Sequence, residues 1–493
     1  MRMFARLVGA AAMLAVSASA ALSSRTDLVL GVVLEPPHLD PTAGAAAAID
    51  EIVYANIYEG LTRIGPGGDI LPALAEDWDI SDDGRTYTFK LRGGVKFHDG
   101  TVFDAADVKF SLERAMAEDS TNAQKVLFSA IDSIEVLDPV SLKITLKQPQ
   151  GSFLYNMAWG DAVIVAPESA DGNKEKPIGT GPFKFENWAR GSSVTIVKNA
   201  DYWGEPAGLD RAEFRFIPDA AAAVTALLSG DVQAFPNLQA GDALAQIEAD
   251  LRFKVVIGAT EGETILAINN GKKPFDDLKI RQAISHAVNR DEVILGATNG
   301  YGVPIGSHFS PANPAYVDLT ATYPYDVERA KALLAEAGYP DGFSATLKLP
   351  PPPYARLGGE IIASQLREVG INLEIVPMEW AQWLEQVFTN KDYDLTIISH
   401  TEPDDINIYA RDDYYFDYKS PEFKAVMTEL DATADPEKRK ELYSQAQRII
   451  ADDAANVFLF QLPKIGVWDA KIEGMWENMP IQANDLTSAH WVD

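Results

Sequence analysis

Apolar and polar residues alternate along the whole chain in short strand-like runs and longer helical runs. Residues 28–34 form an apolar run typical of a buried opening strand, and residues 86–91 and 141–146 alternate as half-buried strands do. No fixed-period repeat or long low-complexity linker separates these runs. The pattern therefore predicts compact α/β lobes rather than a solenoid.

Three segments combine helical spacing of apolar residues with capping signals. Asp326 precedes an apolar face over residues 327–337, and Gly338 then supplies a stop. Helices are predicted in the same way over residues 436–452 and 278–288. Because each segment is apolar along one face, we expect these helices to pack against a core.

Four consecutive prolines occupy residues 350–353, after a predicted strand at 345–349 and before a predicted helix at 359–369. Each proline disfavours helix in the residue before it, so the run is expected to be extended. A stiff loop is the simplest interpretation. Its position between a strand and a helix also suits the edge of a ligand cleft.

The first twenty residues are typical of a secretory signal peptide. Arg2 and Arg6 flank the start, residues 7–16 are apolar, and Ala18-Ser19-Ala20 forms an A-x-A cleavage site. We therefore expect cleavage after Ala20 and a soluble mature chain in the periplasm. The sequence contains no cysteine, so neither a lipid-attachment cysteine nor disulfide or thiol chemistry is expected.

Acidic residues far outnumber basic ones. The chain has 72 Asp and Glu against 42 Lys and Arg, a formal net charge of −30, which argues against nucleic acid or an anionic membrane surface as a partner. We interpret the acidity as a contribution to solubility. The length of 493 residues, 47% of them hydrophobic, exceeds what one core organises and predicts two or more lobes.

The sequence lacks the motifs that mark common catalytic sites. It contains no G-x-S-x-G, H-E-x-x-H, P-loop or G-x-G-x-x-G motif. No two of its six histidines lie four residues apart, so a zinc site would need ligands from distant parts of the chain. Carboxylates at residues 402, 404 and 405 could act as acid and base, but no nucleophile accompanies them. We predict a binding protein, not an enzyme, without cofactor or metal.

Several motifs carry a family resemblance. They include LAEDW at 74–78, GRTYTF at 84–89, RGGVKFHDGT at 92–101, PIGTGPF at 177–183 and AGYP at 337–340. In this order they make the chain similar to the bacterial extracellular solute-binding proteins of family 5, the peptide and nickel class served by ABC importers. The similarity covers nearly the whole mature chain.

The resemblance implies the α/β fold of a type II (cluster C) periplasmic binding protein, with two lobes that close over a ligand and an extra subdomain in the first lobe. Lobe I is expected at residues 21–58, 176–267 and 461–493, the inserted subdomain at 59–175, and lobe II at 268–460. The chain would then cross between lobes near residues 267–269 and 460–462.

The resemblance also implies where the solute binds. In peptide-binding relatives, a lobe II strand ends in a loop with a Gly-Trp pair and then an aspartate that holds the ligand's α-amino group. Here the strand at 394–398 is followed by Ser399, His400, Thr401, Glu402, Pro403, Asp404 and Asp405. Ser399-His400 thus replaces Gly-Trp. Asp404 is the first choice for the ammonium partner, with Asp405 and Glu402 behind it, because a charge buried in a closed cleft needs an opposite charge.

Other residues extend the predicted site. Arg411 or Arg356 could hold a carboxylate with two hydrogen bonds, although either could instead form a surface ion pair. Trp380 stands where relatives place an aromatic wall, although it could belong to the core. Gly44 and Ala45 match a stretch that pairs with peptide backbone, where small side chains allow close approach.

The sequence therefore predicts a monomeric solute-binding protein that captures di- or oligopeptides and hands them to a membrane permease. The unusual Ser399-His400-Thr401 stretch leaves an opine, an oligosaccharide or a nickel chelate open as the solute. A sensory receptor that keeps the same fold also remains open.

Overall fold

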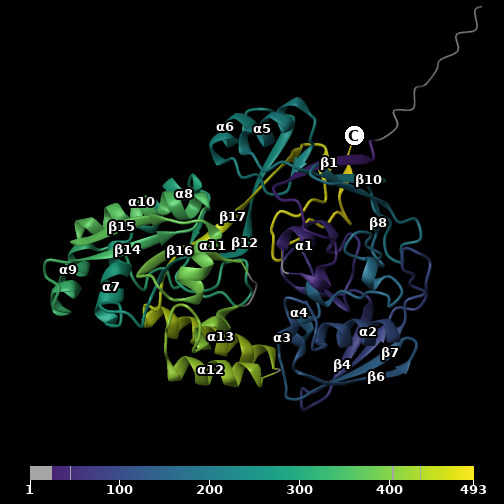
Figure 1. The fold of residues 1–493 in the computed structure, drawn as a ribbon, viewed down its shortest axis with the longest axis horizontal. Helices are drawn as coiled ribbons and strands as arrows, with labels where there is room; N and C mark the ends of the chain where they lie inside the picture. The colour runs from purple at the N-terminus through teal and green to yellow at the C-terminus, as the bar shows by residue number, and fades with distance from the viewer. Residues whose placement is uncertain (1–24, 45, 402–404, 434, 493) are drawn as a thin grey trace, which may run out of the picture.

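A computed structural model describes residues 25–44, 46–401, 405–433 and 435–492. An eleven-stranded sheet runs through both lobes in these residues. Two long antiparallel strands, β12 (Phe253–Ile268) and β17 (Val457–Asp469), cross from one lobe to the other (Figure 1). No helix in the described part of the chain is long and apolar enough to cross a membrane. The predicted signal peptide lies outside the described residues.

The lobe I part of the large sheet contains β1, the first strand of the described residues. β1 (Asp27–Val32) pairs in parallel with β10 (Arg211–Phe216), which continues antiparallel through β9 (Ser193–Lys198) to β8 (Phe183–Ala189). Further elements are α1 (Ala47–Val53), α5 (Ala220–Ser229), β11 (Ala234–Phe235), α6 (Leu244–Glu248), β18 (Ile472–Glu473) and β19 (His490–Trp491). The predicted opening strand is confirmed but ends at Val32.

A second sheet lies within the range predicted for the inserted subdomain. Its antiparallel order is β4-β5-β7-β6. The strands are β4 (Ala75–Ile80), β5 (Thr86–Leu91), β6 (Ile131–Asp138) and β7 (Ser141–Leu146), and the subdomain adds β2 (Thr62–Ile64), β3 (Ile70–Pro72), α2 (Ala105–Met116), α3 (Lys125–Phe128) and α4 (Phe153–Asn156). Its buried side chains, from Leu61 to Ala166, form a core of their own. The strands predicted at 86–91 and 141–146 are confirmed with these bounds.

Lobe II continues the large sheet in the order β15-β14-β16-β12. Its elements are α7 (Leu278–Ala287), α8 (Arg290–Thr298), β13 (Val303–Pro304), α9 (Val327–Glu336), β14 (Phe343–Leu349), α10 (Pro353–Glu368), β15 (Ile371–Pro377), α11 (Trp380–Trp383), β16 (Leu395–His400), α12 (Pro421–Asp431) and α13 (Pro436–Asp452). A π-helical turn, Leu384–Thr389, follows α11, and a 3-10 helix, Ile406–Ala410, follows β16. In Figure 1, α12 and α13 lie on the side of lobe II that faces the inserted subdomain.

The predicted cap at Asp326 is confirmed, and the other two predicted helices are capped in the same way. Asp326, Asp277 and Asp435 each accept a hydrogen bond from a backbone N–H in the first turn of α9, α7 and α13. The helix predicted at 359–369 begins earlier, at Pro353, because the first position of a helix does not need the N–H that proline lacks. The extended part of the proline run is therefore shorter than predicted, and Arg356 lies within α10.

The register of the two crossing strands shifts close to the predicted crossings at 267–269 and 460–462. The register between β12 and β17 breaks between Ala259 and Glu263, opposite Gln461 and Pro463. From Glu263 to Ile268, β12 also pairs with β16 of lobe II.

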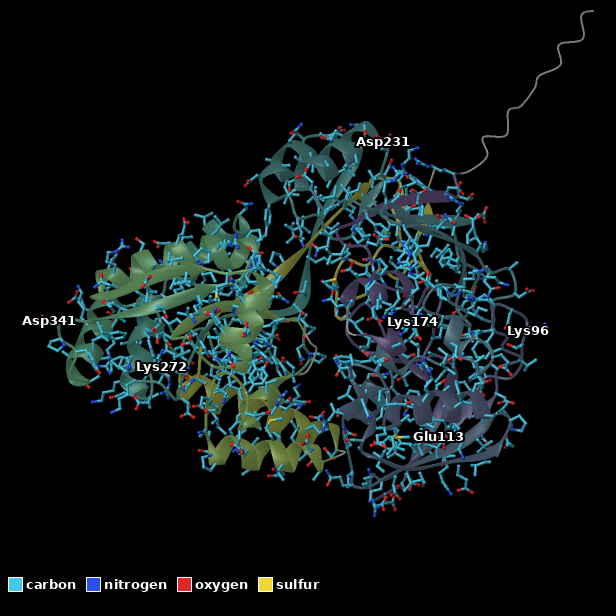
Figure 2. All side chains as sticks on the ribbon, in the orientation of Figure 1. Lys96, Glu113, Lys174, Asp231, Lys272 and Asp341 are labelled. Atoms are coloured by element: carbon cyan, nitrogen blue, oxygen red, sulfur yellow. The ribbon has the colours of Figure 1, made fainter. Side chains whose placement is uncertain are left out.

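Charged side chains cover both lobes. Figure 2 shows oxygen- and nitrogen-tipped side chains over their outer faces, with Lys96 and Glu113 on the inserted subdomain and Lys272 and Asp341 on lobe II.

Candidate binding cleft between the lobes

A large cavity lies between the inserted subdomain and lobe II. Its volume is about 1510 Å³, and its walls come from residues 124–159 on one side and residues 380–443 on the other. Pockets for small organic ligands usually measure about 300–1,000 Å³. The cleft is therefore large enough for an extended solute, in agreement with a ligand held between two lobes.

Aromatic rings form the lobe II wall. Trp380, Trp383, Phe388, Tyr414 and Tyr415 all line the cleft. Trp380 and Trp383 lie edge to face, with ring centroids 5.8 Å apart. Trp380 is 43% exposed and Trp383 only 4%, so Trp380 is available to a solute while Trp383 supports it from beneath. The indole Nε1 of Trp383 donates to Thr396 Oγ1 at 2.9 Å, which fixes the ring against β16.

Lobe I contributes a smaller aromatic surface opposite. Tyr155 and Trp159 line the cleft, with ring centroids 6.3 Å apart. Rings on both lobes can enclose apolar groups of a solute, because aromatic side chains bury large areas and pack edge to face.

A buried cluster of ionisable side chains forms the base of the lobe II wall. Asp405 Oδ1 lies 2.8 Å from His308 Nε2, and Asp405 Oδ2 lies 3.6 Å from His400 Nδ1. Burial alone would raise the pKa of the Asp405 carboxyl, but the two imidazoles outweigh it and hold that pKa well below its usual value. Asp405 is therefore an anion at the edge of the cleft.

The two lobes also touch at the cleft mouth. A Cβ atom at Gly151 would lie 2.1 Å from Arg439 Nη1 and 2.5 Å from the carbonyl oxygen of Thr433. Gly151 belongs to the inserted subdomain and the other two residues to lobe II. Only glycine fits this contact unless the lobes shift.

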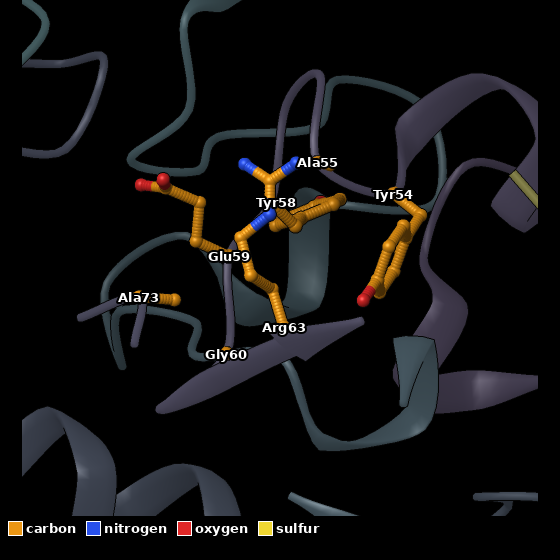
Figure 3. Close-up of a pocket in the computed structure, with 7 residues that line it drawn as sticks. All are labelled: Tyr54, Ala55, Tyr58, Glu59, Gly60, Arg63 and Ala73. Atoms are coloured by element: carbon orange, nitrogen blue, oxygen red, sulfur yellow. The ribbon is translucent and has the colours of Figure 1, made fainter. Parts of the chain in front are cut away.

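A second, much smaller cavity lies inside lobe I. Figure 3 shows its lining, including Tyr54, Tyr58, Glu59 and Arg63. Glu59 accepts hydrogen bonds of 2.8 Å from Thr180, Tyr202 and Trp203, and burial raises the pKa of its carboxyl. The cavity measures about 10 Å³, which leaves room for one water molecule at most. It is too small for a solute.

The structure brings six of the predicted site residues together at the cleft: Trp380, Ser399, His400, Thr401, Asp405 and Arg411. Ser399 and His400 are the last residues of β16 and not loop residues, because their backbones still pair with Thr264 and Glu263 of β12. Arg411 is 52% exposed and lies over the Tyr414 ring, 5.0 Å from its centroid, within 3.6 Å of Asp413.

Other predicted residues are placed differently. Arg356 is not part of the cleft lining; its Nη2 donates to the carbonyl oxygen of Met378 at 3.3 Å and lies 3.6 Å from Glu379. Gly44 is likewise outside the lining and lies against His38. The first choice for the ammonium partner, Asp404, lies outside the described residues together with Glu402 and Ala45.

Sequence reasoning missed His308 and the lobe I rings Tyr155 and Trp159. His308 is separated from Asp405 by 97 positions. No local motif connects such residues, so only the folded chain shows that they meet.

Comparisons with known proteins agree with this architecture. Residues 69–420 match the family described as bacterial extracellular solute-binding proteins, family 5 Middle. A dipeptide-binding protein of Escherichia coli is 32% identical over 435 residues, which cover 78% of this chain and 80% of that protein. A glutathione-binding protein of Salmonella paratyphi A is 34% identical over 380 residues, which cover 76% and 73%.

A solved structure has the same fold. It is the periplasmic binding protein DppA of Helicobacter pylori in complex with the peptide STSA, associated with an ABC transporter. The TM-score is 0.81 at 28% identity, over 95% of this chain and 99% of that one.

Proposed function

The chain belongs to the bacterial extracellular solute-binding proteins of family 5, and we propose that it captures a short peptide between its lobes and delivers it to the permease of an ABC importer. The cleft carries this proposal. It combines room for an extended solute with aromatic walls on both lobes and opposite charges, Asp405 and Arg411, in one lining. A peptide offers the matching groups, namely apolar side chains and two charged ends.

Calorimetric titration of the purified protein tests the proposal. The ligand set contains dipeptides, tetrapeptides and glutathione, with an opine and an oligosaccharide as the non-peptide arms. We expect one peptide bound per chain and no heat from the non-peptide arms. Heat from an opine or oligosaccharide alone, or no heat from any peptide, would contradict the assignment.

Arg411 is proposed to hold the peptide carboxylate. Arg411→Ala is expected to weaken binding of a free dipeptide about 10- to 100-fold, because a hydrogen bond to a charged group contributes about 1.5–3 kcal/mol. The same peptide with an amidated C-terminus has no carboxylate, so its affinity is expected to change little. Parallel titrations of both peptides measure the difference.

Arg356→Ala is the matched control, since Arg356 lies outside the cleft lining. It is expected to leave both affinities near those of the unmodified protein. Equal losses for the free and the amidated peptide in Arg411→Ala would contradict the carboxylate role.

A further inference from the structure

Three side chains of the types that bind metal ions meet at the base of the cleft. His308 follows β13, His400 ends β16, and Asp405 precedes the 3-10 helix Ile406–Ala410. One nitrogen or oxygen atom of each lies within 4.8 Å of the other two. Three separate segments of lobe II thus supply two imidazoles and one carboxylate to one point.

The distances are close to those of a metal site. Zinc binds histidine nitrogen and carboxylate oxygen at about 2.0–2.2 Å, so tetrahedral geometry places neighbouring ligand atoms about 3.3 Å apart. The carboxylate oxygens of Asp405 lie 2.8 Å from His308 Nε2 and 3.6 Å from His400 Nδ1, on either side of that value.

The outer ring nitrogens are held as in metal sites. His308 Nδ1 lies 3.2 Å from the Tyr409 hydroxyl, and His400 Nε2 lies 3.0 Å from the Tyr415 hydroxyl. Asn456 donates to the same Tyr409 oxygen at 2.9 Å. Metal-binding histidines usually donate their other ring N–H to such an acceptor, which fixes the tautomer and the ring orientation. Each imidazole is therefore set to offer one nitrogen toward Asp405.

The cluster is buried on one side and open on the other. The His308 side chain is fully buried, whereas His400 and Asp405 line the cleft. Two of the three side chains thus border the cleft, and three protein ligands leave one position of a four-coordinate ion unfilled. Structural zinc sites use four protein ligands, whereas sites that bind a further group keep one position open.

We propose that His308, His400 and Asp405 bind one divalent transition-metal ion of the kind that imidazole favours, Zn²⁺ or Ni²⁺, with one coordination position open to the cleft. The single carboxylate leaves the loaded site with a net positive charge. The open position would accept a nitrogen or oxygen atom of a solute. This site does not require that the solute is a peptide.

Titration of the chelator-treated full chain with ZnCl₂ and with NiCl₂ tests the proposal. We expect one ion per chain by calorimetry and a rise in the thermal midpoint. His400→Ala and Asp405→Asn should each weaken binding about 100-fold or more, beyond the 10- to 100-fold typical of losing an outer partner. Tyr415→Phe removes only the outer partner of His400 and is expected to fall within that 10- to 100-fold range.

His286→Ala is the matched control, because His286 is outside the cluster and bonds to the carbonyl oxygen of Pro324. It should bind the ion as the unmodified protein does. Absence of stoichiometric binding in the unmodified protein would overturn the site. So would unchanged binding in the folded Asp405→Asn and Tyr415→Phe variants, as judged by circular dichroism. These titrations contain no peptide, so their outcome is independent of the peptide proposal. A chain that binds one metal ion but no peptide would support this site and contradict the peptide proposal alone.

Discussion

Replacement of Trp383 by alanine is expected to lower the free energy of unfolding by about 3–5 kcal/mol, the usual range for removing a buried tryptophan. Trp383 is 4% exposed and packs against Trp380, Phe388 and Tyr415 with ring centroids 5.8–6.3 Å apart. Its loss also leaves Thr396 Oγ1 without the indole donor in the interior. We expect the variant to lose solute affinity as well, because the wall beneath the solute collapses.

Trp380→Ala is the matched variant. Its ring is 43% exposed in the cleft, so its removal is expected to change the free energy of unfolding by about 1 kcal/mol or less. Its effect on peptide affinity should be larger, about tenfold or more, since exposed aromatic side chains in a binding site bury most of their area against the ligand. Urea denaturation and calorimetric titration separate the two effects.

The two tryptophan variants are expected to differ: Trp383→Ala should lose mainly stability, and Trp380→Ala mainly peptide affinity. Equal stability losses would mean that Trp380 also belongs to the core, the alternative that the sequence left open. An unchanged affinity in Trp380→Ala, with a folded protein, would show that the aromatic wall does not contact the solute.

Local signals predicted the local structure well. Strands β5 and β7 match their predicted bounds because alternation along a half-buried strand is visible in consecutive residues. The caps at Asp326 and Asp277 follow from backbone donors only two or three residues away. The start of α10 differs from the prediction because proline is accepted at the first position of a helix, and the end of β16 differs because Ser399 and His400 still pair with β12.

The residues at the cleft also differ in how far the sequence could locate them. The stretch around His400 and Asp405 could be located from its resemblance to a family loop. His308, Tyr155 and Trp159 could not, because their roles depend on contacts between segments far apart in sequence. Asp405 has its closest ionic partner in His308, which no spacing rule connects to it.

Three buried carboxyl groups in lobe I are expected to make the stability of the protein depend on pH. Asp50 and Glu51 lie on α1, and Asp161 lies two residues after the cleft residue Trp159. Burial raises the pKa of Glu51 and of Asp161 to about 7 each. Burial and the neighbouring carboxyl of Asp161 raise the pKa of Asp50 as well, and the described residues give buried Asp50 Oδ1 no hydrogen-bond partner.

These raised pKa values make the folded protein less stable as the pH rises. A carboxyl whose pKa is higher in the folded than in the unfolded chain binds its proton more tightly when folded, so its contribution is present at low pH and is lost as the pH rises through about 7. Between pH 6 and pH 8, Glu51 and Asp161 together are expected to remove about 2–3 kcal/mol of stability. His98 and Lys464 act in the opposite direction, because burial lowers their pKa values to about 4 and about 8.

Neutral variants isolate the carboxyl contribution from these opposing groups. Asp161→Asn and Glu51→Gln are each expected to raise the free energy of unfolding by about 2–3 kcal/mol more at pH 8 than at pH 5, since the amide carries no charge to desolvate and a folded-state pKa of about 7 keeps the buried carboxyl protonated at pH 5. Urea denaturation at pH 5, 6, 7 and 8 measures the difference. Glu113→Gln, on the exposed face of α2, should alter stability by less than about 0.5 kcal/mol at every pH. If Asp161→Asn instead destabilised the protein at pH 8, the buried carboxyl would have to be ionised and paired, and the raised pKa of that group would be wrong.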